Sequence, residues 1–328
     1  MSNETSLIER IRARIPSRDP AGGLRIGIGD DAAVLRLPRQ SEWVLTCDAF
    51  LENVHFLAHA HLAQAVGFKA LARATSDLAA MGAVPRFFLL SLALPSTRAG
   101  QWLDVLLAGM ARAARRFGLV LAGGDTAQHP TVAISITVLG EVAPRRAVTR
   151  SGARPGDLLY VTGRLGAAQL GLELVLRGMY RQRRWQPLLR RHLYPELRLA
   201  LGQWLSAQRL ASAMIDTSDG LSTDLAHLCR ASRVGARLWA ERIPTVRVLP
   251  ALREHGFDPL ELALHGGEDY QLLFAVPRRF QRRIPKSHRG TPITRIGEIT
   301  RGRSLVLVGP DGRATTLEPR GWDHFRSE

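Results

Sequence analysis

Leu119-Val-Leu-Ala-Gly-Gly-Asp-Thr126 joins a short run of apolar residues to two glycines and an acid. The apolar residues predict a strand over Leu119–Ala122 that enters the glycines directly. Glycine lets a backbone approach a ligand closely, and the aspartate that follows supplies a short carboxylate. The second half of the chain repeats the pattern in His265-Gly-Gly-Glu-Asp269, which precedes an apolar strand over Tyr270–Val276. The two stretches indicate a duplicated α+β unit.

Predicted helices and strands alternate on both sides of these stretches. In the first half they are the helices Leu7–Ile15, Leu62–Met81 and Trp102–Phe117 and the strands Trp43–Thr46, Phe87–Leu94 and Thr131–Val142. In the second half they are the helices Ala167–Leu176, Leu197–Leu205 and Thr223–Ala231, the last capped by Ser222, and the strands Leu158–Thr162, Met214–Asp216, Ile293–Ile299 and Ser304–Val308. Turn-forming residues crowd the sequence between Pro144 and Gly156. We therefore predict an α+β fold of two domains, 1–148 and 149–328.

The composition is that of a globular protein. Hydrophobic residues make up 45% and charged residues 23% of the 328 positions, which excludes disorder, collagen and coiled coil as descriptions of the whole chain. No apolar run reaches the roughly 18 residues of a membrane helix, and the N-terminal stretch lacks the apolar core of a secretory signal. The only two cysteines, Cys47 and Cys229, cannot make a disulfide framework. We expect a cytoplasmic protein without membrane contact.

The net charge of +16 favours anionic partners. Only Lys69 and Lys286 among the 45 basic residues are lysine, so the excess reflects a bias toward arginine along the whole chain. One cluster stands out, between Arg177 and Arg191. We interpret it as a solvated, arginine-rich insertion, because no nucleic-acid recognition motif accompanies it. An RNA-binding or nucleotide-responsive module is the alternative, and salt-sensitive RNA binding without any enzymatic turnover would favour it.

Aspartates carry most of the functional signal. Carboxylates that converge repel one another unless cations lie between them. Mg²⁺ takes oxygen ligands and commonly bridges protein carboxylates to substrate phosphates. The aspartates therefore predict a magnesium–nucleotide site, although each motif taken alone fits an ordinary turn or helix cap as well. Those that lie in glycine-rich or loop-edge motifs, eight of 15, are Asp30, Asp31, Asp48, Asp77, Asp125, Asp216, Asp219 and Asp269.

Other catalytic motifs are missing from the sequence. It contains neither the glycine-lysine phosphate loop nor a dinucleotide fingerprint nor a kinase catalytic loop. The spacing of His55, His59 and His61 would suit zinc only with further ligands, so surface or substrate-facing histidines are favoured. Ser218 lacks the elbow sequence of a nucleophilic serine. A nucleotide would therefore bind by another arrangement.

Six motifs occur in order along the chain. They are Gly27-Ile-Gly-Asp-Asp-Ala-Ala33, Thr46-Cys-Asp48 with His55-Phe56, Ser76-Asp-Leu-Ala-Ala-Met-Gly82, Gly123-Gly-Asp-Thr126, Asp216-Thr-Ser-Asp-Gly-Leu221 and Gly266-Gly-Glu-Asp-Tyr270. Together they resemble thiamine-monophosphate kinases, of the superfamily that includes aminoimidazole ribonucleotide synthetase. The resemblance runs from near Ser6 to the ending Gly321-Trp322-Asp323-His324-Phe325.

The resemblance implies a two-domain PurM-like architecture, in which N-terminal α/β domains pair into a barrel-like homodimer interface and a C-terminal α/β domain follows. It implies that ATP phosphorylates thiamine monophosphate to thiamine diphosphate with the help of several Mg²⁺ ions. The metal ligands that it implies are Asp30, Thr46, Cys47, Asp48, Asp77, Asp125, Asp216 and Asp219. The ATP contacts that it implies are Gly124, Asp125, Arg150 and Ser218, and the thiamine contacts are His55, Glu268 and Trp322.

Two positions depart from the family pattern. Cys47 stands where the family usually has threonine, and a thiol is a poor Mg²⁺ ligand, so Cys47 would serve through its backbone carbonyl. The helix before Gly123 has no aromatic residue near Ala108 to stack on adenine. Other superfamily members fit less well, because hydrogenase-maturation dehydratases need a C-terminal cysteine and selenophosphate synthetases need a reactive cysteine near the N-terminus.

The implied reaction needs no general base. The acceptor is a phosphate monoester whose second pKa is about 6, so it is largely dianionic at neutral pH. The obstacle is repulsion between two polyanions. Bridging Mg²⁺ ions and Arg150 would neutralise the charge and align an in-line transfer. We expect direct transfer without a phosphoenzyme.

Overall fold

The computed structural model describes residues 4–19, 21–28, 32–38, 40–323 and 325. The chain divides into two compact units, one of Met1–Leu78 with Ala83–Arg145 and one of Ala79–Gly82 with Arg146–Glu328. Each unit combines helices with a β-sheet, which confirms the predicted α+β fold class. Within the described residues, no helix is both long enough and apolar enough to cross a membrane.

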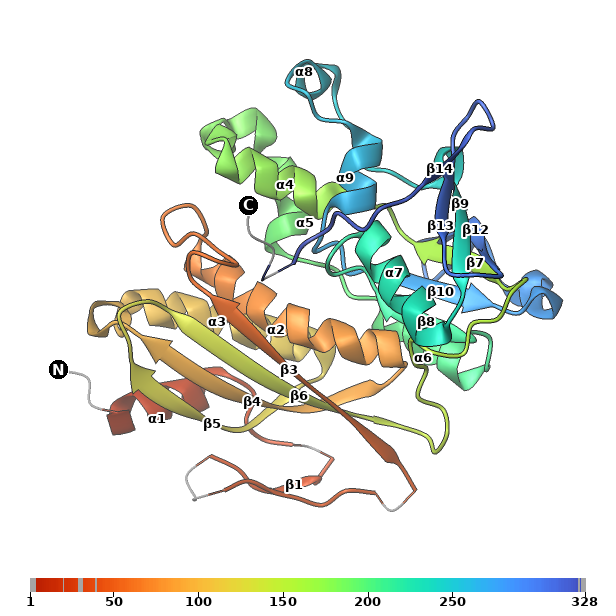
Figure 1. Cartoon of the computed structure of the whole chain (residues 1–328). Helices are drawn as coiled ribbons and strands as arrows, with labels where there is room; N and C mark the ends of the chain where they lie inside the picture. The colour runs from red at the N-terminus through yellow and green to blue at the C-terminus, as the bar shows by residue number, and fades with distance from the viewer. Residues whose placement is uncertain (1–3, 20, 29–31, 39, 324, 326–328) are drawn as a thin grey trace. The chain divides into compact units, whose positions relative to one another are not determined.

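The first unit is built on a four-stranded sheet. Its elements are α1 (Glu4–Arg14), β1 (Leu24–Ile26), β2 (Val34–Leu35), β3 (Glu42–Leu51), α2 (Ala63–Met81), β4 (Val84–Leu94), α3 (Gln101–Phe117), β5 (Val120–Gln128) and β6 (Ala133–Val142). The strand order is β3-β6-β4-β5, with β4 and β5 parallel and β6 antiparallel to both of its neighbours. Helices α2 and α3 lie along one side of this sheet (Figure 1).

Alternating side chains give this sheet one buried face and one partly exposed face. Along β6, Ile134, Ile136 and Val138 are buried, whereas Ser135 and Thr137 between them are half-buried. Successive strand residues point to opposite faces, so the buried set packs toward the helices. Side chains of the β1–β2 hairpin pack on an apolar cluster at one end of the other face. The same face also carries Ser91, Asp125, Ser135 and Thr137.

The second unit contains an eight-stranded sheet ordered β14-β13-β9-β12-β7-β10-β8, with β11 paired to β12. Its strands are β7 (Leu158–Thr162), β8 (Ala213–Asp216), β9 (Gly235–Trp239), β10 (Leu272–Val276), β11 (Ser287–His288), β12 (Thr291–Thr300), β13 (Leu305–Val308) and β14 (Ala314–Thr316). Its helices are α4 (Ala167–Leu176), α5 (Arg190–Leu193), α6 (Leu199–Ala207), α7 (Leu221–Ser232), α8 (Pro250–Glu254) and α9 (Pro259–His265). Strands β7, β8 and β10 are buried throughout. Their continuous apolar runs fit a sheet covered on both faces.

Strands β3 and β5 extend well beyond their predicted C-terminal ends. The prediction ends the first strand at Thr46, whereas β3 continues to Leu51, so Cys47 and Asp48 lie inside a strand. Likewise β5 continues through the two glycines to Gln128. In both places the hydrogen bonds to a neighbouring strand outweigh the turn preference of Gly and Asp.

The start of α7 also differs from the prediction. Ser222 does not cap this helix; Gly220 occupies the cap position with φ 114°, and the Ser222 hydroxyl lies 2.9 Å from Nδ1 of His265. The backbone N–H of Gly220 donates to the Asp224 carboxylate at 3.0 Å. Asp224, inside the first turn of α7, therefore caps the helix in place of Ser222. A negative charge there is favoured by the positive end of the helix dipole.

The arginine cluster between Arg177 and Arg191 folds into short helical turns that lead into α5. Its arginines are exposed, whereas Trp185, Leu189 and His192 are buried. These three apolar or aromatic anchors attach the segment to the core of the second unit. The segment therefore has a packed inner side, which the arginine pattern alone does not reveal.

Candidate active site

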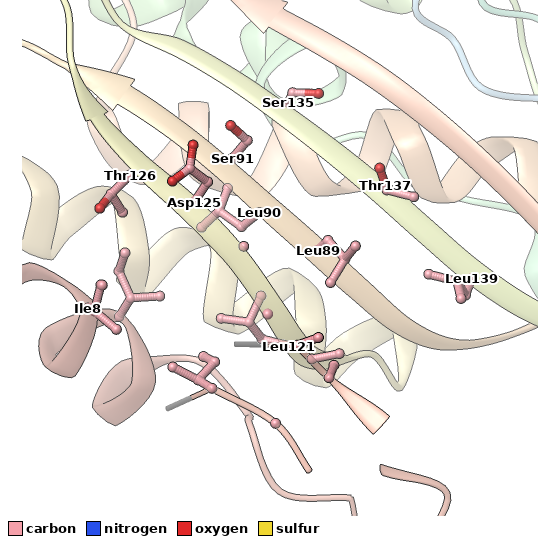
Figure 2. Close-up of a pocket in the computed structure, with 18 of the residues that line it drawn as sticks. Ile8, Leu89, Leu90, Ser91, Leu121, Asp125, Thr126, Ser135, Thr137 and Leu139 are labelled. Atoms are coloured by element: carbon pink, nitrogen blue, oxygen red, sulfur yellow. The ribbon is translucent and has the colours of Figure 1, made fainter. Parts of the chain in front are cut away.

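A cavity of about 760 Å³ opens on the face of the first sheet that α2 and α3 leave uncovered. The loop after β1 contributes Gly27, Ile28 and Ala32, and β5 contributes residues 123–126. Figure 2 shows Asp125 and Thr126 on this strand, with Ile8 of α1 beside them. Two motifs that are far apart in sequence therefore line one cavity. Asp30, at the centre of the first motif, lies outside the described residues.

Hydroxyl groups on neighbouring strands accompany the Asp125 carboxylate. Ser91 of β4 lies opposite Asp125 of β5 and, on its other side, opposite Ser135 of β6. Thr137 points to the same face as Ser135, because it is two residues further along the strand (Figure 2). Sequence analysis did not single out these hydroxyls. The alternation over 131–142 signals Ser135 and Thr137, whereas Ser91 sits in an apolar run without a distinguishing pattern.

The close approach of β4 and β5 requires glycine at position 124. A Cβ on Gly124 would lie 1.9 Å from the carbonyl oxygen of Leu90, whereas a Cβ on Gly123 would lie 3.5 Å from the Leu89 side chain. A side chain at 124 would push the strands apart and displace Asp125. The two glycines therefore differ, because packing fixes only the second.

Thr46, Asp48 and Asp77 lie together on the helix-facing side of β3. The Thr46 hydroxyl donates to Oδ2 of Asp77 on α2. One turn earlier on α2, Nε of Arg73 lies 3.7 Å from Oδ2 of Asp48. The spacing of Arg73 and Asp77 places both on one helix face, a signal that could have identified Arg73 from the sequence. This cluster and the Asp125 cavity occupy opposite faces of the sheet.

Cys47 points away from this cluster. Its thiol is exposed and lies 3.5 Å from the Ser135 hydroxyl. The alternation of side chains along β3 separates the Cys47 thiol from Thr46 and Asp48 on either side. The other cysteine, Cys229, is buried, and burial raises the pKa of its thiol to about 12.

His55 lies in the turn after β3. Its Nδ1 accepts the backbone N–H of Leu51 at 3.0 Å, and its ring packs against Phe50. Nδ1 therefore acts as an acceptor that fixes the imidazole in place, and the proton of a neutral ring sits on Nε2.

Three aspartates lie near the start of α7. Asp216 ends β8 with 2% of its surface exposed, and Asp219 comes just before the helix cap. Burial first, and then the negative charges of Asp219 and Asp216, raise the pKa of Asp224 well above its usual value. A divalent cation beside these aspartates would relieve the repulsion. Sequence analysis missed Asp224, although an acid in the first turn of a predicted helix is a helix-start signal.

The candidate metal-ligating atoms in both units are oxygen atoms, which suits Mg²⁺. Among the described residues, no group of three or more His, Cys, Asp or Glu side chains is arranged to hold a metal ion by itself. Mg²⁺ usually keeps several waters and binds one or two carboxylates together with substrate phosphates. The Thr46–Asp77 pair and the Asp216–Asp219 pair fit that mode of binding.

Ser218, Asp219, Glu268 and Trp322 meet in the second unit. The backbone N–H of Glu268 donates to the Ser218 carbonyl at 2.8 Å. From the C-terminal segment, the N–H of Trp322 donates to the Asp219 carbonyl at 2.9 Å, and Trp322 is 51% exposed. The segments around residues 218, 268 and 322 are therefore brought together at one turn.

Arg150 interacts electrostatically with a residue of helix α7. Burial and the positive charge of Arg150 lower the pKa of His227 on α7, and the negative charge of Asp219 opposes them. The backbone carbonyl of Arg150 also accepts a hydrogen bond from Ser232 at 3.0 Å. These interactions place Arg150 within electrostatic reach of the helix that begins at the Asp219 turn.

Asp269 is a buried acid beneath the Glu268 turn. Its carboxylate accepts the backbone N–H of Gly166 and, at 3.0 Å, that of Ala168 at the start of α4. Burial outweighs these hydrogen bonds and raises the pKa of Asp269 to about 7.

This raised pKa makes stability depend on pH. An aspartate in an unfolded chain has a pKa of about 4, so the stability that Asp269 contributes is full below that value and is lost as pH rises toward 7. Asp269→Asn does not titrate. The unfolding free energy of wild type minus that of the variant should therefore fall by roughly 3 kcal/mol between pH 5 and pH 8. Urea unfolding in metal-free buffer measures it; Asp311→Asn is the control, and a pH-independent difference contradicts the expectation.

Comparison with known families covers both units. The family model "AIR synthase related protein, N-terminal domain" matches residues 29–142, and "AIR synthase related protein, C-terminal domain" matches residues 154–309. The thiamine-monophosphate kinase of Escherichia coli K12 is 37% identical over 335 residues, covering 98% of each chain. That of Bacillus subtilis 168 is 34% identical over 92% of this chain and 94% of its own.

Solved structures agree. The thiamine-monophosphate kinase of Stenotrophomonas maltophilia K279a superposes with a TM-score of 0.81 at 36% identity, covering 95% of this chain and 98% of its own. A structure described as "AaThiL complexed with AMPPCP and TMP" has a TM-score of 0.78 at 33% identity, covering 98% and 97%. The resemblance drawn from the six motifs is therefore confirmed, and this chain belongs to the thiamine-monophosphate kinase family, whose two domains are of the AIR synthase related type.

Proposed function

We propose that this chain transfers the γ-phosphoryl group of ATP to thiamine monophosphate, giving ADP and thiamine diphosphate. The observation that carries the proposal is the similarity to the Escherichia coli kinase over 98% of both chains. A relative that is described as complexed with AMPPCP and TMP supports the pairing of an ATP analogue with this acceptor. The enzyme works in the cytoplasm on these small molecules, and nucleic acid is not a partner.

Backbone groups and Arg150 contact the phosphates directly, and the carboxylates act on them through Mg²⁺. Gly124, Asp125, Arg150 and Ser218 bind ATP, and His55, Glu268 and Trp322 bind the thiamine moiety. The residues that hold Mg²⁺ are Asp30, Thr46, Cys47 through its carbonyl, Asp48, Asp77, Asp125, Asp216 and Asp219. When bound, Mg²⁺ neutralises phosphate charge and polarises the group that is transferred.

The protein supplies position and charge rather than a base or a nucleophile. The acceptor phosphate is already largely dianionic at neutral pH, so no side chain has to remove a proton. Arg150 compensates negative charge, while the missing side chain at Gly123 leaves space beside Asp125 for a phosphate. Transfer is direct and in line.

A coupled ADP-release assay tests the proposal. Thiamine monophosphate should support turnover, and thiamine and aminoimidazole precursors should not. Incubation with ATP labelled in the γ-phosphoryl group should leave no label on the denatured protein. Turnover with an aminoimidazole precursor alone, or a stable phosphoenzyme, would overturn the assignment.

Asp48→Asn should lower kcat about a hundredfold at saturating ATP and leave the fold intact. The change removes a charge from the cluster of Thr46 and Asp77, while the Arg73 guanidinium 3.7 Å away still has an amide oxygen as its neighbour. Steady-state kinetics and circular dichroism measure the two parts. Arg145→Gln, in the same unit but with an exposed side chain, is the control. Near-normal turnover of the Asp48 variant would remove this residue from the metal site.

Two chains pair through the uncovered face of the first sheet. Leu45 is 62% exposed and Leu89 is 38% exposed on this face, which is an apolar surface of the kind that marks an interface. A double change, Leu45→Glu with Leu89→Glu, should convert the homodimer into monomers in sedimentation equilibrium. Leu176→Glu, at a leucine that is 59% exposed in the second unit, is the matched control and should leave the dimer intact. A wild-type monomer at micromolar concentration contradicts the pairing.

A further inference from the structure

The arginine-rich segment carries one buried side chain to Glu268. His192 lies on α5, and none of its side chain is exposed. Its Nδ1 lies 3.1 Å from Oε2 of Glu268. Gly171 of α4 leaves room for the histidine, since a Cβ there would lie 2.7 Å from the Cβ of His192. The imidazole is therefore held between a helix and the carboxylate.

The contact with His192 matters for Glu268 because the backbone fixes only the position of its Cβ and not the orientation of its carboxylate. The residue has φ 66°, a left-handed conformation that is uncommon without glycine, and its N–H is bound to the Ser218 carbonyl. Beyond the Cβ, three side-chain torsions still rotate. The Glu268 side chain is 20% exposed, and its contact with His192 favours one rotamer.

We propose that His192 is a positioning residue for the acceptor substrate: by holding Oε2, it keeps the Glu268 carboxylate aimed at the cationic thiamine moiety. This inference rests on the proposed function. At 3.1 Å an Nδ1–H can donate to the carboxylate, and a buried imidazole is costly without a polar partner. The thiazolium charge and the amino group of thiamine are the features that a fixed carboxylate recognises. The segment between Arg177 and His192 therefore serves substrate binding through its buried side.

His192→Ala should raise the KM for thiamine monophosphate about tenfold, with the KM for ATP unchanged. His192→Asn should stay within about threefold of wild type, because the Asn amide carries an N–H near the position of Nδ1. His192→Gln is the matched comparison, since its amide reaches further, and it should not rescue. Arg190→Gln, at an exposed position on the same helix, is the control variant and should behave as wild type.

A double-mutant cycle tests whether the effect passes through Glu268. In a Glu268→Gln background, His192→Ala should add no further increase in KM. Three outcomes would each overturn the proposal. The effects of the two substitutions on KM could multiply, or the KM of His192→Ala could be unchanged. The third outcome is an equal rise of the KM values for thiamine monophosphate and for ATP that His192→Asn does not rescue. The last outcome is what a purely structural role predicts.

Calorimetric titration separates this inference from the proposed function. It measures the affinity for thiamine monophosphate directly, without ATP and without turnover. Absence of turnover in the wild type would contradict the proposed function, whatever the titration gives. Equal affinity in wild type and His192→Ala would contradict the role of His192, even where turnover is normal.

Discussion

Asp125→Asn should lower kcat for thiamine monophosphate phosphorylation about 10³-fold and leave the fold unchanged. The carboxylate lies in the cavity of about 760 Å³, beside two glycines and opposite Ser91. It is proposed to bind both a metal ion and ATP, so one uncharged amide replaces two interactions that stabilise the transition state. The effect should exceed that of Asp48→Asn, because Asp48 has Arg73 as a partner within the protein.

The measurement is steady-state kinetics at saturating ATP and Mg²⁺, with urea unfolding to establish that the variant is folded. Asp311→Asn is the control, because Asp311 is an exposed turn residue whose carboxylate accepts the N–H of Arg313. Its kcat should equal that of the wild type. A loss smaller than tenfold in Asp125→Asn would place the transferred group elsewhere.

Gly124→Ala should lower the free energy of unfolding by about 3 kcal/mol. The added Cβ would lie 1.9 Å from the Leu90 carbonyl oxygen, and this oxygen is part of the backbone of β4, so it cannot rotate away. The strands must separate, which weakens the parallel ladder between β4 and β5. Urea or heat denaturation measures the change.

Gly123→Ala is the matched control, since its Cβ would meet only the Leu89 side chain at 3.5 Å, an ordinary contact. Its unfolding free energy should stay within about 1 kcal/mol of wild type. Equal stability of the two variants would mean that the strands shift without cost, and the packing argument for Gly124 would be lost.

Hydrophobic periodicity predicted the elements whose burial is continuous or strictly alternating. The predicted strand Leu158–Thr162 and helix Ala167–Leu176 have the same bounds as β7 and α4. In both, the local pattern and the tertiary environment favour the same conformation, because β7 is buried throughout and α4 buries Leu170, Leu174 and Val175 on one side. The six motifs likewise identified the family, which the comparisons confirm.

Sequence reasoning was weaker where long-range pairing decides the outcome. Cys47 and Asp48 read as a strand end, yet β6 continues to pair with β3 through both residues. The two glycine pairs also look alike in sequence. Gly124 nevertheless lies inside a ladder, whereas Gly267 belongs to a turn before β10. A neighbouring strand, and not the local residues, makes the difference.

Partners of the site residues were the hardest to foresee. Arg73 and Asp224 lie on helices, where a charged residue usually faces solvent, and only the fold brings them to Asp48 and to Asp219. His192 sits in a stretch whose arginines suggest a surface segment. Its burial follows from packing against α4, which no local pattern encodes.

The contrast between the two thiols has a practical use. A maleimide dye should modify Cys47, which is exposed, and leave Cys229 untouched, because burial keeps that thiol protonated. Each chain would then carry a single fluorophore without any engineering. Cys47 lies on the sheet face proposed to pair, so the rate of labelling would slow as protein concentration rises. The labelling rate would therefore report how fast the two chains dissociate and associate.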